Sequence, residues 1–245
     1  MTFEDGSRFM LATTSGIDGA LAIGYQAGQS MLPTASWQGN TAIGYQALQL
    51  VTTATAETAL GYGALQNATG GANTAVGSQA LNSDTTGDQN TALGAIALAH
   101  NLTGQGNSAF GAGALLGNIS GSYNVGFGYQ TLNWNVSGAS NIAIGMNSIA
   151  SASTTNDNIG IGVASLKGNG TGFTVLTGNQ GAQNVAIGSS ALYNYTFGAG
   201  NVALGYQSGY NLTTGSDNIL IGAATSSNTI NNLRSNKTYR ASLKT

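Results

Sequence analysis

The acidic side chains are the first candidates for catalysis in this sequence, because paired carboxylates can act as general acid and base. Asp84 and Asp88 share one turn and form a conceivable pair, and the single histidine, His100, also falls in a turn. The other carboxylates are scattered, so we interpret all of these groups as solvated turn residues and predict that the chain is not an enzyme. These scattered residues are Glu4, Asp5, Asp18, Glu57, Asp157 and Asp217.

Metal and cofactor chemistry finds little support in the sequence. Cysteine is absent, which removes disulfides, zinc–thiolate sites and thiol nucleophiles together. The nonapeptide pattern of calcium-binding β-rolls is missing, and no glycine-rich phosphate loop precedes a helix. We therefore predict no catalytic residue, no metal site and no cofactor.

Aromatic side chains in turns suggest a different chemistry, because an exposed ring offers an apolar face on which a sugar ring can stack. Trp37, Trp134, Tyr193 and Tyr195 are candidates for receptor binding. The alternative for each is that its ring packs against a neighbouring part of the chain.

Basic residues supply a second set of candidate binding groups. Lys167 and the aromatic Phe173 both lie in the glycine-rich stretch KGNGTGFTVLTGN. Arg234, Lys237 and Arg240 lie near the end of the chain. Clustered positive charge attracts acidic groups, so this terminal segment suits an acidic surface polysaccharide.

A short motif, Asn-x-Ala-aliphatic-Gly, recurs along the chain. The elements that it forms must position the candidate binding residues. Copies include NTAIG at 40–44, NTALG at 90–94 and NVALG at 201–205. Eight of the eleven intervals between successive anchor glycines are 17 residues long, which identifies an internal repeat. The anchors are Gly24, Gly44, Gly61, Gly77, Gly94, Gly111, Gly128, Gly145, Gly162, Gly188, Gly205 and Gly222.

Reading the copies as columns reveals two apolar ladders. One precedes the anchor glycine, as at Ile43 and Leu60, and the other follows it by four residues, as at Leu48 and Leu65. Such short segments fit strands and are too short for helices. We predict an all-β parallel β-roll, or β-solenoid, of about 12 coils, each with a first strand, a bend, a second strand often reading Tyr-Gln-Ala-Leu, and a polar turn.

An asparagine column stands four residues before the anchor, as at Asn73, Asn90 and Asn107. Stacked amides can hydrogen-bond from one coil to the next, so we predict a structural ladder. A tyrosine column after the anchor, including Tyr25 and Tyr45, is also interpreted as structural.

Two large aliphatic ladders are more than one narrow coil can bury. The ladder left outside would form a long apolar stripe, which soluble monomers avoid. Association around a shared three-fold axis would cover it. We therefore predict a homotrimer, without assigning which ladder faces the partners.

Composition excludes some partners. Charged residues make up only 6% of the chain and the net charge is −2, so no basic field for nucleic acid is present. No apolar run reaches the roughly 18 residues of a membrane span, and the start MTFEDGSRFM does not resemble a signal peptide. We predict neither nucleic-acid binding nor membrane insertion.

The AIG-type repeats resemble the head domains of trimeric autotransporter adhesins. The segment NTAIGYQAL, followed by TTGS-type turns, is similar to repeats of bacteriophage tail fibres and of fibre proteins of predatory bacteria. The resemblance covers Leu21 to Gly222. It implies a left-handed, trimeric parallel β-roll used for adhesion, on a cell surface, on a virion or otherwise outside the cell.

Four parts of the chain follow from the repeat. Residues 1–18 form a predicted lead-in or cap, 19–226 the β-roll, 168–178 a loop insertion, and 227–245 a C-terminal cap or tip. Insertions in solenoids emerge on one face and often carry binding. The leading hypothesis is a trimeric fibre adhesin or tail-fibre head that binds a cell-surface receptor, most simply a glycan. A passive spacer is the alternative, and ice binding through the threonine column is a weaker one.

Overall fold

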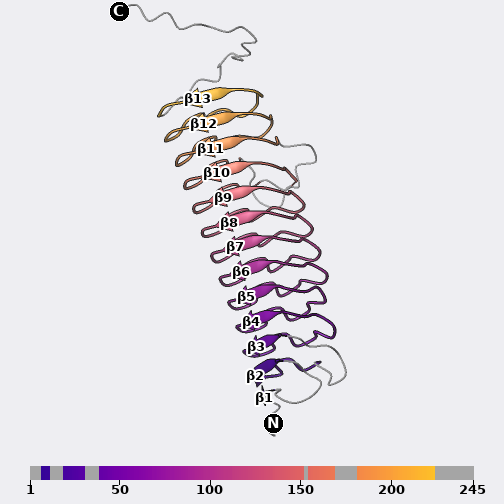
Figure 1. Ribbon diagram of the computed structural model, residues 1–245. Helices are drawn as coiled ribbons and strands as arrows, with labels where there is room; N and C mark the ends of the chain where they lie inside the picture. Colours follow the sequence, from indigo (N-terminus) through magenta and orange to yellow (C-terminus); the bar gives the residue numbers. More distant parts are fainter. Residues whose placement is uncertain (1–6, 12–18, 31–38, 152–153, 169–180, 224–245) are drawn as a thin grey trace, which may run out of the picture.

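A computed structural model describes residues 7–11, 19–30, 39–151, 154–168 and 181–223. It is a rod of stacked coils in which the strands follow one another in sequence order from β1 to β13 (Figure 1). Twelve strands at about 4.8 Å spacing give a rod roughly 55 Å long. The all-β parallel solenoid predicted from the repeat is confirmed.

Each coil contributes one strand to a single sheet. β1 pairs with β2 antiparallel, and every later neighbour pair from β2 to β13 is parallel. The strands are β1 Ser7–Leu11, β2 Leu21–Tyr25, β3 Thr41–Ile43, β4 Thr58–Leu60, β5 Thr74–Val76, β6 Thr91–Leu93, β7 Ser108–Phe110, β8 Val125–Phe127, β9 Ile142–Ile144, β10 Ile159–Ile161, β11 Val185–Ile187, β12 Val202–Leu204 and β13 Ile219–Ile221.

Register follows the anchor glycines even where the repeat length changes. Ile43 lies opposite Leu60 on the neighbouring strand, as the column alignment predicts. Ile159 pairs directly with Val185 although the coil between them is nine residues longer than the usual 17. The extra residues therefore leave the ladder between β10 and β11 intact.

The two apolar ladders separate cleanly into an inner and an outer one. In each short strand the middle residue, such as Ala92, is buried, while its neighbours Thr91 and Leu93 point outward. The ladder after the anchor, which includes Leu81 and Leu98, is fully buried. The interior of each coil is thus filled from this second ladder, because the small strand alanines leave room for only one large side chain.

The predicted second strand is wrong. The Tyr-Gln-Ala-Leu segment forms turns in which alternate residues adopt left-handed backbone angles, with φ of 57° at Gln46 and 50° at Leu48. Non-glycine residues reach this region only where the surrounding structure enforces it. Here the neighbouring coil does so, because the Leu48 N–H donates to the carbonyl of Ala64 at 3.1 Å. The alternation lets the coil close tightly while keeping bonds between coils.

The asparagine ladder is confirmed. The N–H of Asn90 donates to Oδ1 of Asn73 at 2.9 Å, and Nδ2 of Asn107 donates to Oδ1 of Asn90 at 3.1 Å. Nδ2 of Asn90 also donates to the carbonyl of Gly104, in the polar turn that ends the same coil, at 2.8 Å. These buried amides tie each strand to the turn beyond it, which satisfies polar groups in the interior.

Candidate functional site

A lysine and two tyrosines form a surface cluster on three successive coils near the insertion. The Lys167 ammonium donates to the Tyr193 hydroxyl at 3.1 Å and lies 5.1 Å from the centre of that ring. The Tyr193 ring stacks on Tyr210, with centroids 5.0 Å apart and planes 9° from parallel. Cation and rings hold one another in fixed positions, so the cluster is pre-organised. We call these three residues the Lys–Tyr cluster.

The Lys–Tyr cluster occupies one repeat position, five residues after the anchor glycine. In the N-terminal coils this position forms an amide ladder at the surface. There, Nε2 of Gln49 donates to Oε1 of Gln29 at 2.9 Å, and Nε2 of Gln66 donates to Oε1 of Gln49 at 2.6 Å. In the middle coils the same position is buried at Ala99, Asn133 and Ala150. The exchange of surface amides for a cation and aromatic rings therefore distinguishes the C-terminal coils from the N-terminal ones.

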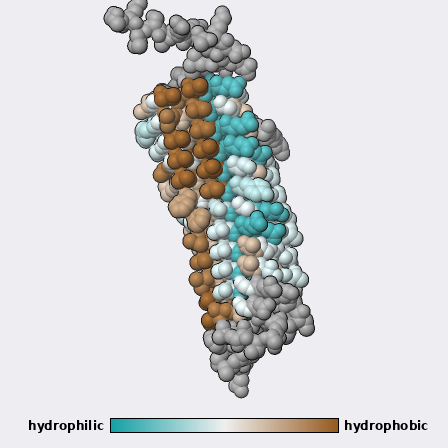
Figure 2. Space-filling view, in the orientation of Figure 1, coloured by the Kyte–Doolittle hydropathy of each residue, from teal (hydrophilic) through white to brown (hydrophobic). Residues whose placement is uncertain are grey.

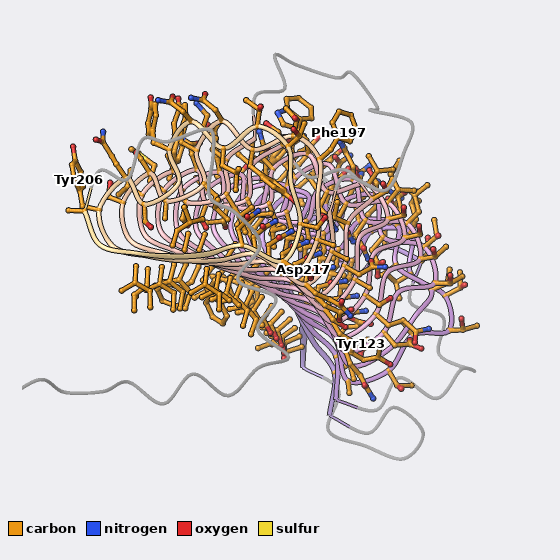
Figure 3. The ribbon with its side chains drawn as sticks, turned by 90° about the horizontal axis from the view of Figure 1, so that it is seen from above. Tyr123, Phe197, Tyr206 and Asp217 are labelled. Carbon is orange, nitrogen blue, oxygen red and sulfur yellow. The ribbon has the colours of Figure 1, made fainter. Side chains whose placement is uncertain are left out.

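Charge further distinguishes Lys167. It is the one lysine or arginine in the sequence between Arg8 and Arg234. Among the described residues from β2 to β13, Lys167 is therefore the one lysine or arginine that an acidic ligand can meet, and it stands immediately before the predicted insertion. Phe197, which is 46% exposed, projects on the side of the coil away from the sheet (Figure 3).

The other aromatic candidates differ in how deeply the fold buries them. Trp134 is half-buried. Tyr195 lies in the core with 4% of its surface exposed, and its hydroxyl accepts a hydrogen bond from Nδ2 of Asn201 at 3.4 Å. Burial raises the pKa of Tyr195 to about 12. We therefore place this tyrosine among the packing residues. Trp37, Phe173, Arg234, Lys237 and Arg240 lie outside the described residues.

Sequence reasoning missed Tyr210 and Phe197. Tyr210 follows Gly205 by the same five residues that separate Tyr193 from Gly188. A column alignment at that position would have found it. No comparable signal points to Phe197, whose turn varies between coils.

The outward residues of the sheet form a second feature. From β8 to β13 both outward positions of each strand are apolar, with Phe127 55% and Ile221 69% exposed. From β3 to β7 the first of these positions is threonine or serine. Figure 2 shows the result, a double apolar column that narrows to a single one. The apolar strip comprises Val125, Phe127, Ile142, Ile144, Ile159, Ile161, Val185, Ile187, Val202, Leu204, Ile219 and Ile221.

Comparison with known proteins gives no relative. No family model, characterised protein or solved structure matches this chain. The fold itself is that of a parallel β-solenoid repeat protein with a period of about 17 residues.

The acidic residues are placed differently from the prediction. Asp84 and Glu57 are both fully buried, so their interpretation as solvated turn residues is wrong. The position of Asp84, seven residues after the anchor, points into the coil, where Nδ2 of Asn101 donates to the carboxyl at 2.8 Å. His100 is exposed.

In the described ranges no group of three or more His, Cys, Asp or Glu side chains is arranged to hold a metal ion. The same part of the chain contains no helix with the length and apolar character that a bilayer crossing requires.

Proposed function

We propose that this protein is the head of a homotrimeric extracellular fibre, of the adhesin or tail-fibre kind, that attaches to a glycan on a cell surface. The apolar strip carries the proposal, because it leaves a straight and continuous hydrophobic face along the C-terminal half of the sheet. A left-handed winding of the coils belongs to the same proposal. The Lys–Tyr cluster is its binding element.

The apolar strip supports self-association for a geometric reason. Contiguous exposed apolar patches on soluble monomers rarely exceed a few hundred Å². Six strands at about 4.8 Å spacing make this strip roughly 25 Å long. A second copy has the same spacing, so its rungs fit those of the first without mismatch. Around a three-fold axis each strip contacts two others, which covers both outward columns.

Charge on the apolar strip is expected to dissociate the trimer. The double change Ile144→Asp and Val202→Asp places carboxylates where partners would bury them without a counter-ion, which is strongly unfavourable. Light scattering should then show a fall from three chains to one chain of 24.5 kDa, with an unchanged circular dichroism spectrum.

Ser140→Asp is the matched control for this experiment. It adds one carboxylate, of the same kind as each of the two strip substitutions, at an exposed turn position where Asp157 stands one coil later. This variant should remain trimeric. A wild-type protein that is already a monomer would contradict the assembly.

Removal of the cation is expected to weaken glycan binding. Lys167→Ala should lower the affinity for acidic glycans about tenfold, the effect of roughly 1.4 kcal/mol, and Tyr193→Ala should lower it at least as much. Binding should also weaken with added salt, because an exposed charge is screened. A glycan array followed by titration calorimetry measures both effects.

Tyr45→Ala supplies the control for ring stacking at a different place on the rod. Tyr45 stacks between Tyr25 and Tyr62 at centroid distances of 5.3 Å and 5.2 Å. Its loss should leave glycan binding unchanged. If a folded trimer binds no glycan or target cell above background, the spacer function replaces the adhesive one.

A further inference from the structure

Two carboxyl groups lie inside the solenoid where its other coils hold amides. Glu57 stands four residues before Gly61, so it occupies a rung of the asparagine ladder between Asn40 and Asn73. Its own N–H donates to Oδ1 of Asn40 at 2.8 Å, as an asparagine on that rung would. Glu57 is 0% exposed, and its Oε2 has no hydrogen-bond partner.

Asp84 is the second buried carboxyl, and it shares a donor with Glu57. Nδ2 of Asn73 lies 3.1 Å from Oε1 of Glu57 and 3.4 Å from Oδ2 of Asp84. The same nitrogen also lies 2.9 Å from the carbonyl of Gly87. A side-chain amide has only two N–H groups, so it cannot satisfy all three acceptors at once.

Few charged groups surround this pair. Asp88, half-buried in the turn that follows Asp84, accepts the N–H of Gly71 at 2.7 Å and adds another carboxylate. His100 is exposed, and the sequence from residue 9 to residue 166 contains no lysine or arginine. No basic side chain of this region can therefore neutralise the two buried acids.

Either a proton or a metal ion can neutralise a buried carboxylate. The hydrogen-bond donors around the two carboxyls indicate which of the two fits this site. A calcium ion requires six to eight oxygen ligands, as a general rule. Here N–H groups already point at the carboxyls, from Nδ2 of Asn73 and from Nδ2 of Asn101. Asn73 cannot turn its oxygen toward them, because that oxygen accepts the N–H of Asn90 at 2.9 Å. These donors would repel a cation, which favours protons.

We propose that Glu57 and Asp84 form a proton-linked lock that keeps the coils of β4 to β6 closed while the two carboxyls are protonated and lets them open when the protons are lost. Ionisation would place two like charges around one amide in a buried interior. Such charges are relieved only by admitting water. The coils between residues 57 and 88 are the part of the rod that must open.

The electrostatics agree in direction with this geometry. Burial raises the pKa of Glu57 from 4.5 to about 8, and burial raises the pKa of Asp84 from 3.8 to about 7. A raised carboxyl pKa means that stability is greatest below the unfolded values and is lost as the pH rises through the folded ones. Between about pH 5 and pH 7 the opening constant therefore rises up to tenfold per pH unit for each carboxyl.

The lock is local. In the C-terminal coils the ladder reads Asn158, Asn184, Asn201 and Asn218, with hydrogen bonds between successive amides. Raising the pH should consequently loosen β4 to β6 while β11 to β13 stay closed. The proposal does not depend on glycan binding or trimer formation.

Hydrogen exchange of the full chain tests the lock, with rates corrected for their intrinsic pH dependence. Peptides spanning residues 57–90 should lose at least tenfold in protection between pH 5 and pH 7, and those spanning 185–204 should not change. In the double variant Glu57→Asn and Asp84→Asn, which places an amide at both ladder positions, the first set should become independent of pH.

Infrared spectroscopy of the wild-type protein supplies a measurement that does not depend on how a variant folds. A protonated, buried carboxyl has a carbonyl band distinct from carboxylate bands, and this band should persist at pH 6 and disappear by pH 9. Its absence at pH 6 would overturn the proposal, as would pH-independent exchange of residues 57–90. Protection restored at pH 8 by added calcium in the wild type alone would assign the site to a cation and also overturn it.

Discussion

Replacement of Gly94 by alanine is expected to cost more than about 4 kcal/mol, a size reached by few single substitutions. The backbone at Gly94 has φ of 137°, a conformation that side-chain-bearing residues rarely adopt. An added Cβ would lie 2.6 Å from the carbonyl carbon and 2.7 Å from the oxygen of Gly111 in the next coil. Neither can move away, because both belong to the stacked backbone. Urea denaturation followed by circular dichroism measures the loss.

Gly113→Gln is the control that separates steric conflict from the general cost of losing a glycine. Gly113 has φ of 67°, and an added Cβ there meets only a flexible side-chain atom of Gln130 at 3.4 Å. Gln130 stands at the same repeat position one coil later, with φ of 52°. The substitution should therefore cost below about 1.5 kcal/mol. Equal losses in the two variants would show that close approach at the anchor is not the determining factor.

The period of the anchor glycines was sufficient to predict strand order and register. A residue type repeated at a fixed phase can form a continuous column only if the coils are stacked in parallel, so the pairing of Ile43 with Leu60 follows from spacing alone. The extra residues before Gly188 must belong to the connection between β10 and β11 for the same reason, and residues 169–180 of this connection, with most of the predicted insertion 168–178, lie outside the described residues. The effect of the extra residues on the ladder is nil, since Ile159 and Val185 remain partners.

The conformation of the second segment could not be predicted from its composition. Tyr-Gln-Ala-Leu alternates in the manner of a strand, yet Gln46 and Leu48 adopt left-handed angles. Local propensity disfavours those angles. Hydrogen bonds to the coils above and below enforce them, and such bonds are invisible in a single repeat.

The two buried acids show that a residue's position in the repeat predicts its burial better than its residue type does. Glu57 resembles a scattered carboxylate when residue types alone are considered, although its distance from Gly61 places it on the asparagine ladder. Asp84 likewise stands at the repeat position of Asn101 and Asn118, whose amides are bonded to each other inside the coil at 2.7 Å. A turn residue is expected to be solvated, and here the fixed phase of the repeat overrides that expectation. The same alignment finds Tyr210 beside Tyr193.

Truncation of the two ladders within one coil is expected to lower stability by very different amounts, and this difference distinguishes the inner ladder from the outer one. Leu98 is 0% exposed and Leu93 is 41% exposed, although both are leucines five residues apart. Leu98→Ala should cost about 3 kcal/mol, because the lost side chain leaves a cavity between the leucines of adjacent coils. Stacked strands above and below limit collapse of that cavity.

Leu93→Ala removes the same atoms from the outward face. It should cost below about 1 kcal/mol in a separated chain, because the Leu93 side chain is already largely exposed to water there and its loss removes little buried apolar area. Measuring both variants in the dissociating background of Ile144→Asp and Val202→Asp removes any contribution from partner chains. Comparison with the otherwise wild-type protein then reports how much of the outer ladder the partners bury. A larger loss at Leu93 than at Leu98 in the separated chain would reverse the assignment of inside and outside, and with it the basis for placing the trimer interface on the sheet.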